Sequence, residues 1–127
     1  MASAKDLRPP VAVGHVRLVA SDVAAAARWC EEVGFRPIFA APDFAVLELR
    51  GGTHLVLRKA EEEPKRGTPA PFDLMVDDLA EAHRDYLAKG LAPGAIEKGR
   101  IHDSFPLLGP RGQVFTVVSS HAGDRPV

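Results

Sequence analysis

The two halves of this 127-residue chain repeat one another. A shift of 56 residues superposes identical residues at four points: Leu18 on Leu74, Asp22 on Asp78, Gly34 on Gly90 and Pro37 on Pro93. Nearer the end of each half a shift of 60 residues fits better, and it places Gly52 on Gly112, Leu55 on Phe115 and Leu57 on Val117. The difference indicates a slightly longer loop in the second half. A repeat of this kind is typical of two copies of one supersecondary unit.

Each half has the pattern of a strand, a helix and three further strands. Ser21 and Asp77 are predicted helix N-caps, because their side-chain oxygens can accept from the unpaired amides of a first helical turn. Gly34 and Gly90 are predicted to end the helices in the left-handed conformation. The alternating runs after each helix contain predicted turns at Gly51-Gly52 and at Pro110-Arg111-Gly112. The predicted fold class is therefore α+β, with two tandem β-α-β-β-β modules.

The repeat and the turn signals also predict the boundaries of a single domain over residues 10–121. Module one covers residues 10–60 and module two covers residues 70–121. The charged stretch AEEEPKRGTP contains the linker, residues 61–69, whose acidic run is expected to be a solvated loop. Residues 1–9 and 122–127 are expected to be tails.

Charge and composition exclude several classes of partner. With 16 basic and 17 acidic residues the formal charge is −1, which gives no strong field to attract nucleic acid or an anionic membrane. The longest apolar run, Val23 to Ala27, is far shorter than the roughly 20 residues of a membrane span. The single cysteine, Cys30, cannot form an internal disulfide or a CxxC site. A reducing cytoplasm is the expected location.

Alternation along the predicted strands separates a core face from an opposite face. The core face is almost wholly apolar: Val16, Leu18, Leu47, Leu49, Leu55, Leu57, Phe72, Leu74, Val76, Phe115 and Val117. The opposite face mixes apolar and polar side chains: His15, Arg17, Phe44, Val46, Glu48, His54, Val56, Arg58, Asp73, Met75, Val114, Thr116 and Val118. A mixed surface of this kind is typical of a small-molecule site.

The chain resembles the glyoxalase, bleomycin-resistance and extradiol-dioxygenase superfamily, also called vicinal oxygen chelate proteins. The resemblance rests on GHVRLVASDVAAAARWCEEVGF, FDLMVDDLAEAHRDYLAKG and LGPRGQVFTVV, in that order, and covers roughly Val11 to His121. It implies that each module forms a cupped, incompletely closed, barrel-like mixed sheet. It also implies that two modules pair to enclose a site, within one chain or by exchange between two, and that the protein is a homodimer.

The resemblance also implies where a metal would bind. Members that use a metal draw ligands from the first and last strands of their modules, and here those positions are His15, Val56, Pro71 and Thr116. Only His15 is a good ligand, because valine and proline side chains have no donor atom and a threonine hydroxyl is a poor one. The expectation is therefore a protein with no metal and no cofactor, like the drug-sequestering bleomycin-resistance branch.

Alternatives stay open at the sequence level. His15, His54, Glu48 and Asp73 form a donor set that a shifted metal site could use, although Arg17 or Arg58 could pair with the acids instead. An enzyme of the same fold, a lyase, isomerase or dioxygenase, is thus the rival interpretation. A regulatory module that binds a partner protein is a third, and no sequence feature supports it.

Other polar residues have simpler interpretations. His102 either contacts ligand from the second module or lies in a surface loop. His102, Asp103 and Ser104 do not form a predicted hydrolase triad, because the serine is not on a sharp nucleophile turn. His83, on the second helix, and His121, after the last strand, are expected to be inert. Trp29 and Tyr86 are expected to pack outside the cup.

The sequence thus predicts a protein that binds a small amphipathic organic molecule without a metal. Residues expected to contact this ligand are His15, Phe44, Val46, Glu48, His54, Val56, Asp73, Met75, His102, Val114 and Thr116. No catalytic residue is assigned.

Overall fold

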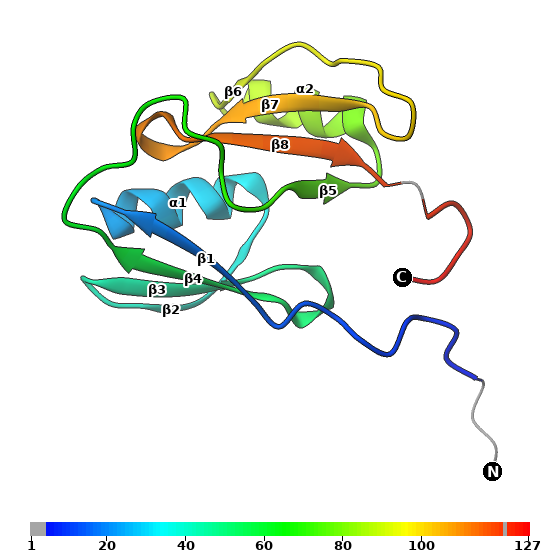
Figure 1. The fold of residues 1–127 in the computed structure, drawn as a ribbon, viewed down its shortest axis with the longest axis horizontal. Coiled ribbons are helices and arrows are strands. Elements are labelled where there is room, and N and C mark those ends of the chain that lie inside the picture. The colour runs from blue at the N-terminus through cyan, green and yellow to red at the C-terminus, as the bar shows by residue number, and fades with distance from the viewer. Residues whose placement is uncertain (1–4, 121) are drawn as a thin grey trace.

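The computed structural model describes residues 5–120 and 122–127 (Figure 1). Module one contains β1 (His15–Ala20), α1 (Val23–Val33), β2 (Arg36–Ala40), β3 (Phe44–Glu48) and β4 (His54–Lys59). Module two contains β5 (Leu74–Val76), α2 (Leu79–Ala88), β6 (Ala92–Pro93), β7 (Ser104–Leu108) and β8 (Val114–Ser119). The predicted order of elements, a β-α-β-β-β module twice, is confirmed. The expectation for His121 lies outside the described residues.

Each module forms one four-stranded mixed sheet. Sheet A has the strand order β1-β4-β3-β2, and sheet B has the order β5-β8-β7-β6. In both, the first strand runs parallel to the last strand of the module, and the other pairs are antiparallel. The sheets are cupped and do not close into barrels, so β1 and β5 are edge strands (Figure 1).

Both helices begin one residue later than the sequence predicted. The N-caps are Asp22 and Asp78, whose carboxylates accept from the amides of Ala25 and Glu81, each at 3.0 Å. The predicted caps have other partners: Ser21 donates to Glu63, and Asp77 pairs with Arg50. Two adjacent residues in each half were suitable as caps, and the second of each pair, which has an extended backbone at the helix entry, acts as the cap.

The helix ends and the turns follow the repeat. Gly34 (φ 130°) and Gly90 (φ 79°) have positive φ just past the two helices, as predicted. The predicted turns become short 3₁₀ turns at Arg50–Gly52 and Pro110–Gly112. Each contains two successive residues with positive φ, and one of the four is not glycine: Arg111, at φ 59°.

One hydrophobic core serves both modules. It includes Leu18, Leu47, Leu55, Leu57, Leu74, Phe105, Phe115 and Val117, and the predicted core residues Val16, Leu49, Phe72 and Val76 pack against it half-buried. α1 covers sheet A, and its Trp29 ring stacks on Phe115 of sheet B with centroids 4.9 Å apart. The Tyr86 hydroxyl on α2 donates to the Val33 carbonyl at the end of α1 (3.1 Å). Trp29 and Tyr86 therefore pack inside the chain and join its halves.

Among the helices of the described part of the chain, none combines the length and the apolar character needed to cross a membrane.

Candidate functional site

Sheet A has an open face on the side opposite α1. Along its strands the buried Leu18, Leu47 and Leu55 alternate with side chains that point away from the helix. We call this set the open face of sheet A: His15, Arg17, Val19, Arg36, Phe39, Phe44, Val46, Glu48, His54, Val56 and Arg58. It contains every residue of module one that the sequence assigned to ligand contact. Arg36 and Phe39 were missed: a β-bulge between Pro37 and Phe39 places both on the same face, although their sequence separation is an odd number.

One end of the open face is a row of four polar side chains, one from each strand. The register pairs His15 with His54, His54 with Glu48, and Glu48 with Arg36. The His54 Nε2 lies 2.9 Å from one Glu48 oxygen, and the Arg36 guanidinium pairs with the other oxygen. The His15 and His54 rings meet edge to face, with centroids 6.0 Å apart. We call these four residues the polar row.

Glu48 is the one acid of the polar row, and its side chain is only 16% exposed. Its hydrogen bond with Arg36, and next that with His54, hold the pKa of the carboxyl below its usual value, and these bonds outweigh the opposing effect of burial. Glu48 is therefore an anion at neutral pH with both oxygens in use. Such a carboxylate fixes the His54 ring and the Arg36 guanidinium, and it offers little to a further cation.

The other end of the open face is aromatic and basic. The Phe39 and Phe44 rings lie 5.1 Å apart and are 51% and 39% exposed. Phe44 is in register with Arg58, and together with Asp43 and Lys59 they line a hollow of about 380 Å³. We call it the Phe44 hollow. Val46 and Val56 lie between the hollow and the polar row.

The donor atoms do not fit the metal site that the superfamily implies. In this chain Val56, Pro71 and Thr116 occupy three of the four expected positions, and Glu48 is engaged by Arg36 and His54. Within residues 5–120 and 122–127, no three His, Cys, Asp or Glu side chains come together as a metal site would require. The shifted set fails within one chain for a clear reason: His15, His54 and Glu48 lie on sheet A, whereas Asp73 immediately precedes β5 of sheet B.

Module two has an open face of different character. Its predicted ligand contacts are Asp73, Met75, Val114 and Thr116, and Pro106 and Leu108 share their face. Met75 is 51% exposed, and Val114 is half-buried. In the described chain, no hydrogen bond, ion pair or ring contact joins this group to the open face of sheet A. The predicted site residues thus form two groups, one on each sheet.

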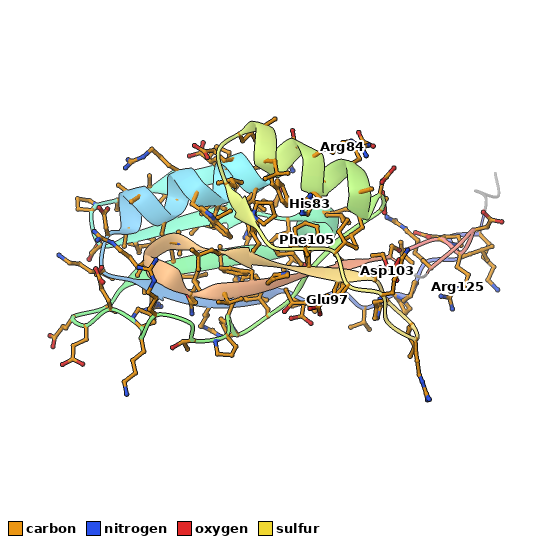
Figure 2. All side chains as sticks on the ribbon, turned by 90° about the horizontal axis from the view of Figure 1, so that it is seen from above. His83, Arg84, Glu97, Asp103, Phe105 and Arg125 are labelled. Carbon is orange, nitrogen blue, oxygen red and sulfur yellow. The ribbon has the colours of Figure 1, made fainter. Side chains whose placement is uncertain are left out.

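His102 belongs to neither open face. Its Nδ1 lies 2.9 Å from the Ser119 carbonyl, and the Ser119 hydroxyl accepts from the Asp103 amide at 3.2 Å. These bonds hold the loop before β7 against the end of β8. His83 lies 2.8 Å from the Gly94 carbonyl and meets the Phe105 ring edge to face (Figure 2). Both histidines therefore make contacts that stabilise module two.

By sequence, no protein-family model and no curated protein matches the chain. Solved structures do match. A lactoylglutathione lyase from Agrobacterium tumefaciens has a TM-score of 0.72 and 17% identity, over 92% of this chain and 99% of that one. A bleomycin resistance determinant encoded on the transposon Tn5 has a TM-score of 0.70 and 21% identity, over 87% of this chain and 98% of that one.

A third similar structure extends over more of this chain. It is a glyoxalase/bleomycin resistance protein/dioxygenase from Nocardioides, with a TM-score of 0.68 and 19% identity, over 98% of this chain and 91% of that one. These proteins differ in their named activities and agree in architecture. The chain therefore has the fold of the glyoxalase/bleomycin resistance/dioxygenase superfamily, the fold that its internal repeat and motifs predicted.

Proposed function

We propose that this protein binds a small amphipathic organic molecule without a metal, in a cup formed by the open face of sheet A and the module-two face of a second copy. The observation that carries the proposal is that both carboxylate oxygens of Glu48 are already paired. Arg36 and His54 occupy its two oxygens, so the acid nearest the histidines orients side chains and is not free to ligate a metal.

The chemistry of the open face of sheet A supports binding. Val46, Val56 and the Phe39–Phe44 pair offer apolar contact, while His15 and His54 offer ring nitrogens that can orient a polar group. One of the similar structures is named a bleomycin resistance determinant, and this name is consistent with binding of a small molecule. An exposed surface of this width needs a cover before it can exclude water from a ligand.

A second copy of the chain is the proposed cover, and the repeat indicates how it would lie. The 56-residue shift relates Arg17 to Asp73 and Val19 to Met75, all near or on the edge strands β1 and β5. Val19 and Met75 are 47% and 51% exposed, and no ion pair engages Arg17 or Asp73 in the described chain. If β1 of one copy lies beside β5 of its partner, opposite charges and apolar side chains face each other.

Charge reversal tests this arrangement. Light scattering of the wild-type protein should give a mass of about twice 13.6 kDa. Arg17→Asp and Asp73→Arg should each weaken the dimer about tenfold or more, because like charges then face across two symmetric contacts. The double variant should restore it. Arg84→Asp, on the outer side of α2, is the control (Figure 2). A wild-type monomer, or a double variant no better than the single ones, would refute the arrangement.

Ligand screening tests the binding function. A thermal-shift screen against metabolite-like and drug-like compounds should find a hit whose stabilisation falls in His54→Ala and persists in Arg84→Ala. The rival interpretation, a metal-dependent enzyme, becomes the better one under two conditions. The purified protein would hold about one iron, manganese or zinc ion per chain, and both His15→Ala and His54→Ala would lose this ion.

A further inference from the structure

We infer that the ligand is an anion with an aromatic body, and that its carboxylate or sulfonate group is bound by Arg58 at the Phe44 hollow. The inference rests on the proposed function and names the class of ligand that the cup selects. It comes from three features of the open face of sheet A: an arginine without a partner, an exposed pair of aromatic rings, and an excess of positive charge.

In the described chain, Arg58 is the unpaired arginine that lies at the aromatic end of the open face. Its register neighbours are Val19 on β1 and Phe44 on β3, both apolar. In the part of the chain that the structure describes, no ion pair or hydrogen bond engages its guanidinium. A guanidinium that a bound molecule covers keeps its charge, so it needs a hydrogen-bond acceptor. Its parallel N–H groups fit an anion with two neighbouring oxygens, such as a carboxylate or a sulfonate. Arg36, by contrast, already has Glu48.

The aromatic pair lies beside this cation. Phe44 lines the hollow together with Arg58, and Phe39 extends the apolar surface at 5.1 Å between ring centroids. Rings that are 51% and 39% exposed can gain contact from a flat apolar ligand. A ligand that spans both features needs an aromatic body and an anionic group attached directly to it.

The charge balance of the face disfavours the opposite sign. The open face has three arginines, Arg17, Arg36 and Arg58, and one acid, Glu48, although the whole chain has a formal charge of −1. Glu48 is occupied by Arg36, and the partner's Asp73 is the proposed neighbour of Arg17. The hollow itself is lined by two basic side chains, Arg58 and Lys59, and by one acid, Asp43. The basic side chains outnumber the acid at the hollow, and Arg58 is the one that lies on the open face beside Phe44, so an anion is favoured over a cation.

Three naphthalene compounds of similar size and different charge test the inference: 2-naphthoate, 2-naphthamide and 2-naphthylmethylammonium. In titration calorimetry at low salt and neutral pH, naphthoate should bind the wild-type protein about tenfold more tightly than the amide, and the ammonium compound least. Arg58→Gln should remove the preference by weakening naphthoate alone. Phe44→Leu should weaken all three. Arg84→Gln should change nothing, because Arg84 points away from the fold (Figure 2).

The outcomes separate this inference from the proposed function. Equal or tighter binding of the amide or the ammonium compound overturns the anion selectivity and leaves small-molecule binding in place. A naphthoate preference that survives in Arg58→Gln overturns the assignment to Arg58. Failure of all three compounds to bind also overturns the inference, while the screen with His54→Ala still judges the proposed function by itself.

Discussion

The two modules agree on one face of their sheets and differ on the other. With the 60-residue shift, the buried positions Ala45, Leu47, Leu55 and Leu57 of sheet A match Phe105, Leu107, Phe115 and Val117 of sheet B, all buried and apolar. On the open faces the same shift places Glu48 on Leu108, His54 on Val114 and Arg58 on Val118. The charged and polar side chains at these positions of module one are thus replaced by apolar side chains in module two. Packing against a helix restricts a position to apolar residues, and an open face has no such restriction.

The comparison predicts that core positions in the two halves unfold together. Phe115→Ala removes a fully buried ring that contacts Trp29 and Phe72 and should destabilise the protein by about 3–5 kcal/mol. Leu55→Ala, at the equivalent position of module one, should cost about 2–5 kcal/mol. Urea denaturation followed by circular dichroism should show one transition for both variants, since the core is one cluster. Two transitions, of which each variant moves only one, would contradict the shared core.

The turns sharpen the comparison, because each contains a left-handed glycine at the equivalent position but the surroundings of the two glycines differ. Gly52 (φ 87°) and Gly112 (φ 85°) are both left-handed, so alanine should cost about 1 kcal/mol or more at either. A Cβ at Gly52 meets open space, whereas one at Gly112 lies 2.5 Å from Arg66 Cγ and 3.3 Å from Arg66 Cα. Gly112→Ala should therefore lower stability by about 2–3 kcal/mol and Gly52→Ala by less.

The measurement is the shift in urea midpoint at constant slope. Arg66→Ala in the Gly112→Ala background serves as the control, because it removes the flexible part of the clash and should recover a fraction of the loss. Equal losses of stability in Gly52→Ala and Gly112→Ala would show that the cost comes from backbone strain and not from the clash with Arg66.

The fold could be predicted because the repeat and the period-two patterns act over short stretches of sequence. Leu55 and Phe115 were assigned to the core, and Gly34 and Gly90 to helix ends, from spacing alone. The caps were wrong by one residue because Ser21 and Asp22 are both suitable residue types, as are Asp77 and Asp78, and residue type alone does not say which of the two lies at the helix entry.

The candidate site could be predicted only in part. Alternation placed His15, Glu48 and His54 on one face, but it could not show that Arg36 neutralises Glu48, since that contact depends on the pairing of β2 with β3. The sequence placed His15 in module one and Asp73 in module two, but it could not show whether the folded chain brings this acid to the histidines; in the described residues it does not. Contacts between distant segments decide both points, and neither leaves a local pattern in the sequence.

The smallest expected effect compares an enclosed carboxylate of module one with an exposed ion pair of module two. Arg36, and next His54, lower the pKa of Glu48, while a hydrogen bond from Lys98 is the main cause that lowers the pKa of Asp103. In each case the folded-state pKa lies below the unfolded one. The stability that each carboxylate contributes is therefore present above its ordinary pKa, 4.5 for Glu48 and 3.8 for Asp103, and is lost as pH falls through the depressed folded value.

Glu48→Gln and Asp103→Asn should thus each lower stability at neutral pH, and both differences from wild type should vanish in acid. Salt separates the two. Both cations are exposed, but the Asp103 side chain is 35% exposed and the Glu48 side chain only 16%, so 1 M salt, with a Debye length of ~3 Å, should weaken the Asp103 effect more than the Glu48 effect. Urea denaturation across pH at low and high salt measures both. If the Glu48 difference persisted unchanged at low pH, its origin would lie in packing and not in the ion pair with Arg36.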